Sequence, residues 1–271
     1  MTRFDLHGKK AIITGAGRGI GKALALGIAE AGAKVAVVSR TASDLQEVVS
    51  EIEAKGGVAF PVEADLTVSD AAERIVKQAV EGLGGVHILI NNAGMNIRKK
   101  AHEVTEEEWD RVVDLNLKAA FFMSQAAGKY MCEQRYGRIV NIASVAGVVA
   151  LRTGVAYGAS KAGLIQMTRV LALEWSKFGV NVNAIAPWYF RTPLTESLLS
   201  DEAFVQEVLQ RTPSGRIGDV EDLVGPAIFL SSDAASYISG QTISVDGGMS
   251  IYGFDKKRGI PSWECLIIGG D

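Results

Sequence analysis

The sequence predicts a single doubly wound α/β domain, in which helices cover both faces of a seven-stranded parallel sheet. Two observations support this prediction. Short apolar segments alternate with segments of helical periodicity along the chain, and such alternation implies parallel strands joined by right-handed crossovers. The strand segments are predominantly apolar, as expected for a sheet buried on both faces. Because no linker or internal repeat divides the chain, residues 1–248 are interpreted as one domain and residues 249–271 as a C-terminal extension.

Seven apolar segments have the length and composition of buried strands. They are Lys10–Thr14, Lys34–Ser39, Val58–Ala64, Val86–Asn91, Gly137–Ser144, Val180–Ala186 and Gln241–Asp246. Helical spacing of apolar residues predicts the connecting helices. These are Ile20–Ala31, Ser43–Lys55, Ser69–Leu83, Thr105–Met131, Ala156–Phe178, Pro193–Gln210 and Val220–Ser231. The best-marked start is Thr105, which together with Glu108 fits a capping box.

The overall composition indicates a cytoplasmic globular protein. Hydrophobic residues make up 48% of the 271 residues, and the net charge of −3 argues against a nucleic-acid partner. Two cysteines give no disulfide framework, which fits a reducing compartment. The N-terminal segment lacks a signal-peptide core, and no apolar run reaches the roughly 20 residues that span a bilayer. The three histidines are not at ligand spacing, so we expect no metal.

A glycine-rich loop follows the first predicted strand. Gly15, Gly19 and Gly21 have the pattern G-x-x-x-G-x-G, which lets the backbone approach a diphosphate at a helix N-terminus. A flexible turn is the alternative interpretation. The position at the first strand–helix crossover favours a Rossmann-type dinucleotide site that includes Arg18 and Ile20.

The second predicted strand ends at Ser39 and Arg40, where an NAD-binding protein usually has an acidic residue for the ribose 2′-hydroxyl. Arg40 and Arg18 can instead form charge-assisted hydrogen bonds with a 2′-phosphate. The alternative is that both arginines are solvated surface charges. The sequence therefore predicts that NADP(H) is preferred over NAD(H).

Further cofactor contacts are expected after the third and fourth strands. Asp65, followed by Leu66, is placed where a carboxylate could accept an adenine amino hydrogen. Asn92, Ala93 and Gly94 could leave room for the adenosine ribose. Ordinary turn chemistry is the alternative for both segments.

Tyr157 and Lys161 are four residues apart and therefore lie on one face of a predicted helix. A nearby ammonium favours the phenolate and lowers the phenol pKa from about 10, so that the pair can exchange a proton with a carbinol or carbonyl oxygen. Ser144 ends the fifth strand, where its hydroxyl can stabilise charge on the substrate oxygen. Asn116 lies within a predicted helix, where asparagine is mildly unfavourable. A functional role such as binding a water molecule would explain why asparagine occurs there.

These motifs together resemble the short-chain dehydrogenase/reductase family from Leu6 to about Gly248. The matching segments are TGAGRGIG at 14–21, NNAG at 91–94, Asn116, Ser144 and Tyr157-x-x-x-Lys161. The resemblance implies that Tyr157 is the catalytic acid/base and that Ser144 orients the substrate carbonyl. It also implies that Lys161 lowers the pKa of Tyr157 and binds the nicotinamide ribose, and that Asn116 holds a water in a proton relay.

The segment from Pro187 to Thr192 resembles the family's P-G-x-x-x-T sequence beside the nicotinamide carboxamide, which implies that both of these residues contact the cofactor. The usual glycine is Trp188 here. A bulky ring cannot adopt a glycine-only conformation cheaply. Trp188 therefore either reshapes the substrate side of the pocket or points away from it.

Within the family, several stretches resemble gluconate 5-dehydrogenase and 2-dehydro-3-deoxygluconate 5-dehydrogenase. They are 91–98, 121–126, 184–195 and 211–230. This resemblance implies a sugar acid or polyol as substrate. Arg98, Arg152 and Arg191 follow strand ends and are candidates to bind a substrate carboxylate bidentately, with a solvated loop arginine as the alternative for each.

Two other functions remain open from the sequence. A 3-oxoacyl-thioester reductase, acting on substrates carried by acyl carrier protein, shares the same motifs. A non-catalytic NADPH-binding sensor or scaffold would also have the glycine loop, although it would not need Tyr157 or Lys161. The helices Thr105–Met131 and Ala156–Phe178 carry apolar residues on more than one face, and the family resemblance implies a homotetramer.

Overall fold

The computed structural model, described here for residues 3–251, contains one seven-stranded parallel sheet in the order β3-β2-β1-β4-β5-β6-β7. The predicted fold class is confirmed. The strands are β1 Lys10–Thr14, β2 Lys34–Ser39, β3 Ala59–Glu63, β4 Ile88–Asn91, β5 Gly137–Ile142, β6 Val180–Pro187 and β7 Thr242–Val245. Every adjacent pair is parallel.

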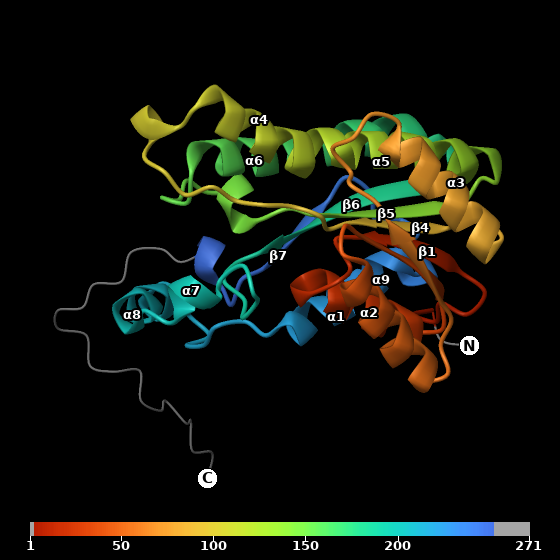
Figure 1. Ribbon diagram of the computed structural model, residues 1–271, viewed down its shortest axis with the longest axis horizontal. Helices are drawn as coiled ribbons and strands as arrows, with labels where there is room; N and C mark the ends of the chain where they lie inside the picture. Colours follow the sequence, from red (N-terminus) through yellow and green to blue (C-terminus); the bar gives the residue numbers. More distant parts are fainter. Residues whose placement is uncertain (1–2, 252–271) are drawn as a thin grey trace, which may run out of the picture.

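Helices cover both faces of the sheet (Figure 1). One layer contains α3 Ala71–Leu83, α4 Glu106–Val113, α5 Ala119–Glu133 and α6 Val155–Trp175. The other layer contains α1 Gly19–Glu30, α2 Ala42–Ala54 and α9 Val224–Ser231, with the short helices α7 Glu196–Leu199 and α8 Glu202–Gln210 at one end. Among the described residues, no helix is long and apolar enough to cross a membrane.

The sheet divides the hydrophobic core into two layers. Ile13 and Val37 belong to the cluster that packs under α1, α2 and α9, whereas Ile12 and Val38 belong to the cluster under α3 and α5. Successive side chains on a strand point to opposite faces. A strand that is apolar at every position therefore supplies both clusters, which explains the continuous apolar segments in the sequence.

The predicted helix over 105–131 starts as expected but is not continuous. Thr105 accepts a hydrogen bond from the Glu108 N–H (3.2 Å), and Glu108 accepts one from the Thr105 N–H (3.1 Å). A π-helical turn over Asp114–Lys118 then separates α4 from α5. This turn contains Asn116, which is buried.

Other boundaries also differ from the sequence prediction. The predicted helix over 193–210 is two helices, because the Asp201 side chain caps a new helix by accepting hydrogen bonds from the Ala203 and Phe204 N–H groups. The predicted helices ending at 178 and starting at 220 include 3₁₀ turns at those ends. Of the predicted C-terminal extension, only the turn Met249–Ile251 lies within the described residues.

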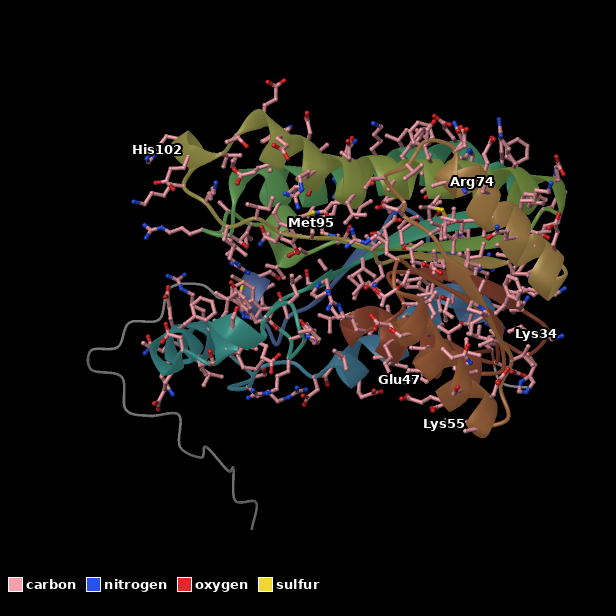
Figure 2. All side chains as sticks on the ribbon, viewed as in Figure 1. Lys34, Glu47, Lys55, Arg74, Met95 and His102 are labelled. Atoms are coloured by element: carbon pink, nitrogen blue, oxygen red, sulfur yellow. The ribbon has the colours of Figure 1, made fainter. Side chains whose placement is uncertain are left out.

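The carboxyl ends of all seven strands lie at one end of the sheet. Figure 2 shows Met95, on the loop after β4, at this end and Lys34, the first residue of β2, at the opposite end. The strand order reverses between β1 and β4. Ligands of doubly wound sheets bind at such a switch point, so the loops after β1 and β4 are expected to border the site.

We expect Thr105→Ala to destabilise the protein by about 1 kcal/mol, because the substitution removes the side-chain cap of α4. Urea unfolding of the Ala variant, with Thr105→Ser as the control that keeps the hydroxyl, measures this effect. Equal stability of the two variants would show that the capping box does not stabilise the fold.

Candidate active site and cofactor cleft

A cleft of about 490 Å³ runs along the carboxyl ends of the strands. Most of the residues predicted from the motifs line it: Gly15, Arg18, Gly19, Ile20, Gly21, Ser39, Arg40, Asp65, Leu66, Asn92, Ala93, Gly94, Ser144, Tyr157, Lys161, Pro187, Trp188 and Thr192. The structure therefore brings the predicted cofactor residues together with Ser144, Tyr157 and Lys161, whereas Asn116, the fourth predicted catalytic residue, does not line the cleft.

The loops after β1 and β4 are fastened together at the switch point. The Thr14 hydroxyl accepts hydrogen bonds from the N–H groups of Asn92 (3.0 Å) and Ala93 (3.1 Å). The Asn92 amide donates to the carbonyls of Thr14 (3.0 Å) and Gly15 (3.1 Å). A Cβ at Gly21 would lie 2.0 Å from the Gly15 carbonyl oxygen, so only glycine permits this approach of α1 to the loop.

The glycine loop and the N-terminus of α1 form a cradle that fits a dinucleotide diphosphate. Gly15 and Gly19 have φ angles of +64° and +55°, which favour glycine. A Cβ at Gly19 would be 3.6 Å from Thr192 Cβ, so the segment after β6 faces this loop. The backbone N–H groups at the start of α1 are available for an anion.

Positive and negative side chains share the end of the cleft beside β2. Arg18 and Arg40 are exposed, and Arg40 Nη1 is 4.0 Å from Asp65 Oδ2. Asp65 Oδ1 accepts hydrogen bonds from the Thr67 N–H (2.9 Å) and hydroxyl (2.7 Å), which lower the pKa of Asp65. Asp44 also lines this end and was missed by the sequence analysis, although it lies in the first turn of the helix after β2.

Asn116 fastens the loop after β4 to α6. Its Oδ1 accepts a hydrogen bond from the Met95 N–H (2.8 Å), and its Nδ2 donates to the Met95 carbonyl (2.9 Å) and to Ser160 Oγ (3.1 Å). A Cβ at Gly94 would lie 3.1 Å from Asn116 Oδ1 and 3.5 Å from Lys161 Nζ. This glycine therefore keeps the path to Lys161 open.

Lys161 is buried with one protein acceptor, the Ile142 carbonyl, at 2.8 Å. Burial lowers the pKa of Lys161 to about 8. Its ammonium is 5.7 Å from the centre of the Tyr157 ring, which lies one helical turn earlier on α6. The Ser144 hydroxyl accepts a hydrogen bond from the Ala146 N–H (3.1 Å).

The environment of Tyr157 differs from the sequence expectation. Burial raises the pKa of Tyr157, while the Ser144 hydroxyl and, to a smaller extent, the charge of Arg98 oppose that rise. Tyr189 raises this pKa further. Lys161 is not among the groups that shift it, because its ammonium points to Ile142 rather than to the phenol oxygen. In this structure, the expected lowering of the Tyr157 pKa by Lys161 is therefore not found.

The Trp188 ring joins the loop after β6 to the end of α8. Its Nε1 donates to the Thr212 hydroxyl (3.0 Å), which in turn donates to the Val208 carbonyl (2.7 Å). The ring also meets Tyr189 edge-on, at 4.6 Å between centroids. Trp188 thus both lines the cleft and fixes its wall, a contact that no local sequence pattern indicates.

The three candidate arginines are not equivalent in position. Arg98 is exposed, yet it is close enough to Tyr157 to affect the pKa of that residue, and its Nη1 is 3.5 Å from the Tyr189 hydroxyl. Arg152 and Arg191 are also exposed, and none of the three arginines is among the residues that line the cleft. Of the three, only Arg98 affects the pKa of the predicted catalytic tyrosine.

Within the described range, 3–251, no group of three or more His, Cys, Asp or Glu side chains is arranged to bind a metal ion.

The chain is similar over most of its length to known reductases and dehydrogenases. Residues 15–250 match the family profile described as "Enoyl-(Acyl carrier protein) reductase". The chain is 42% identical to a tropinone reductase homolog of Arabidopsis thaliana, over 93% of this chain and 96% of that protein. It is also 42% identical to gluconate 5-dehydrogenase of Gluconobacter oxydans, over 92% of this chain and 97% of the relative.

A solved structure of gluconate 5-dehydrogenase from Burkholderia cenocepacia, in complex with NADP and tartrate, has the same fold. Its TM-score is 0.89 at 35% identity, and the match covers 93% of this chain and 98% of that chain.

We expect the stability of Lys161→Met, relative to the wild type, to depend on pH. Because the pKa of Lys161 is lowered from 10.5 to about 8, the folded wild type binds fewer protons than the unfolded chain between these pH values. Its stability therefore rises with pH in that window. The buried charge costs up to about 3 kcal/mol below pH 8.

Urea unfolding of both proteins at pH 7 and near pH 10 tests this prediction. The free energy of unfolding of the Met variant minus that of the wild type should fall by up to about 3 kcal/mol as the pH rises. A difference that stays constant with pH would show that the folded state does not depress the pKa of Lys161.

Proposed function

The chain belongs to the short-chain dehydrogenase/reductase family of oxidoreductases, and on this basis we propose that it interconverts a ketone and a secondary alcohol of a sugar acid or polyol, with NADP(H) preferred over NAD(H). The observation that carries this proposal is the convergence of Tyr157, Ser144 and Lys161 on a cleft whose other end has Arg18 and Arg40. A bound nicotinamide would supply or accept the hydride.

The residues of the chain account for the proton and for the orientation of the substrate. Burial raises the pKa of Tyr157 and so keeps the phenol protonated near neutral pH, which is the form that donates a proton to a ketone oxygen. The Ser144 hydroxyl, which lies within hydrogen-bonding reach of Tyr157, can donate its hydrogen to the same oxygen. Hydride and proton together complete the two-electron reduction. In alcohol oxidation, Tyr157 takes the proton back.

Lys161 and Asn116 position the other groups. The buried ammonium of Lys161 keeps two donor hydrogens beyond the one given to Ile142, and we assign them to the nicotinamide ribose. The side-chain amide of Asn116 is occupied by Met95 and Ser160. A role for Asn116 in holding a water of the proton relay remains a prediction from the family resemblance.

The cofactor and substrate preferences rest on the two ends of the cleft. Arg18 and Arg40 favour a 2′-phosphate, and the similar Burkholderia enzyme was solved with NADP. At the other end, Arg98 lies near Tyr157, where it can pair with the carboxylate of a sugar acid. The names of the Gluconobacter and Burkholderia relatives, both gluconate 5-dehydrogenases, support this substrate class.

The proposal is tested by assaying the reduction of 5-ketogluconate, first with NADPH and then with NADH. The reaction is monitored by the loss of absorbance of the reduced nicotinamide. We expect oxidation of NADPH to be clearly faster at low cofactor concentration. Equal or better use of NADH would contradict the assignment of Arg18 and Arg40. No reaction with either cofactor would contradict the assignment of a sugar acid.

We expect Tyr157→Phe to reduce turnover by about 10²–10⁴-fold, because the ring stays in place while the proton donor is lost. The dissociation constant of NADP⁺, measured by titration calorimetry, should change little. Retained turnover in the Phe variant would remove Tyr157 from the mechanism.

In the wild type, alcohol oxidation should accelerate as the pH rises toward 10, since the raised pKa of Tyr157 limits the phenolate fraction at lower pH.

We expect Arg98→Ala to raise KM for an acidic ketone by about tenfold, with little change for a neutral ketone, since a charge-assisted pair is lost. Arg152→Ala is the matched control, because Arg152 is also exposed but is not among the groups that shift the pKa of Tyr157. If neither of these variants nor Arg191→Ala raises KM for the acidic substrate, arginine recognition of a carboxylate is wrong.

A 3-oxoacyl-thioester reductase is the second candidate. The matching family profile carries the description of an acyl-carrier-protein reductase. In addition, Arg98, Lys99 and Lys100 are consecutive and exposed on the loop after β4, where they could meet an acidic carrier. Oxidation of NADPH by an acetoacetyl thioester at a rate above that with 5-ketogluconate would favour this function.

We also propose that the chain is a homotetramer located in the cytoplasm. Helices α4, α5 and α6 expose large apolar side chains in the single chain: Trp109 38%, Phe122 45%, Tyr130 39%, Val170 44% and Leu173 84%. Such a surface is typical of an interface between subunits. Light scattering should give four times the 28.8 kDa chain mass, and a monomer mass would contradict the proposal.

A further inference from the structure

We infer that Asp44 is a cofactor-discriminating residue, whose carboxylate opposes a 2′-phosphate and accepts a hydrogen bond from a ribose 2′-hydroxyl. Through this residue the preference for NADP(H) over NAD(H) would be smaller than Arg18 and Arg40 alone would produce. The inference rests on the proposed function, since it concerns the cofactor cleft described above.

Asp44 is held against the glycine loop. It lies in the first turn of α2 and lines the cleft with Ser39 and Arg40. A Cβ built on Gly17 would be 2.9 Å from Asp44 Cβ, 3.4 Å from Asp44 Oδ2 and 3.0 Å from Ser39 Oγ. The absence of a side chain at Gly17 therefore lets the carboxylate and the serine hydroxyl come together beside the loop that binds the diphosphate.

The charge of Asp44 is not neutralised by the neighbouring cations. Among residues 3–251, Asp44 forms no ion pair, whereas Glu47 and Glu51 on the same helix both pair with Lys22. Figure 2 labels Glu47 on this helix. The nearest acidic partner of Arg40 is Asp65, at 4.0 Å. Asp44 thus places a free negative charge at the end of the cleft that would hold the 2′ substituent.

The location determines which ligand group Asp44 meets. In doubly wound dinucleotide sites, the ribose 2′ group lies beside the end of the second strand, which here is Ser39. A carboxylate accepts a hydrogen bond from a hydroxyl but repels a phosphate dianion, and this repulsion is strong at short range in a partly buried cleft. Arg18 and Arg40 attract the same phosphate. The net preference is the difference between these opposing effects.

A structural role for Asp44 is the competing explanation, because a negative charge in the first turn stabilises a helix. Such a role predicts a change in unfolding without a change in ligand selectivity. The two explanations are therefore separated by comparing ligands that differ only in the 2′-phosphate.

The experiment measures dissociation constants of 2′,5′-ADP and 5′-AMP, which differ only in the 2′-phosphate, by titration calorimetry for the full chain, Asp44→Asn and a control. Asparagine keeps the size and the acceptor oxygen but removes the charge. We expect 2′,5′-ADP to bind about fivefold to tenfold tighter to Asp44→Asn than to the wild type, and 5′-AMP to bind about equally to both. The gain should shrink at high salt, because screening weakens the repulsion. NADP⁺ and NAD⁺ should show the same pattern.

Glu53→Gln is the matched control. Glu53 lies on the same helix α2, is exposed and does not line the cleft, so this variant removes an equal charge outside the site. Unchanged or weaker binding of 2′,5′-ADP to Asp44→Asn would overturn the inference, and so would an equal gain in Glu53→Gln. If the wild type binds neither NADP⁺ nor NAD⁺, the proposed function itself fails, which is a distinct result.

Discussion

The buried ammonium of Lys161 is the constraint around which the site is built. A charge removed from water is costly unless it finds hydrogen-bond partners, and the protein supplies one, the Ile142 carbonyl at the end of β5. Lys161 also lines the cleft, and the missing side chain at Gly94, where a Cβ would lie 3.5 Å from Lys161 Nζ, leaves space beside the ammonium. Three features keep this ammonium buried while a ligand can still contact it. Helix α6 packs on the sheet, the loop after β4 has a glycine beside Lys161, and Tyr157 lies one helical turn before Lys161.

Much of the fold could be predicted because it depends on local pattern. Uniformly apolar strands such as Lys34–Ser39 mark a sheet buried on both faces, and the Thr105–Glu108 pair marks a helix start that the structure confirms. The boundaries that were wrong depend on contacts that sequence spacing does not report. The helix predicted over 193–210 is divided at Asp201, whose side chain starts a second helix. Polar periodicity alone did not distinguish one helix from two.

The candidate site could likewise be predicted only in part from the sequence. Its members could be listed from motifs, since each motif follows a strand and all strands end at one edge. The contacts among these residues could not be predicted from the sequence, because such contacts join residues that are distant along the chain. The Trp188–Thr212 hydrogen bond spans 24 residues, and the pairing of Asn116 with Met95 spans 21. The pKa of Tyr157 shows the same limit: the spacing to Lys161 suggests a lowered value, whereas burial raises it in the folded chain.

The π-helical turn over Asp114–Lys118 has a consequence for how this part of the chain can evolve. A π turn contains one residue more than an α turn, so it is equivalent to an insertion that rotates α5 by about 100° relative to α4. Losing any one residue there would restore a regular helix but would swing the buried face of α5 away from the sheet. We therefore expect this segment to tolerate substitutions more readily than insertions or deletions. A change in its length would also move Asn116 relative to the rest of the site.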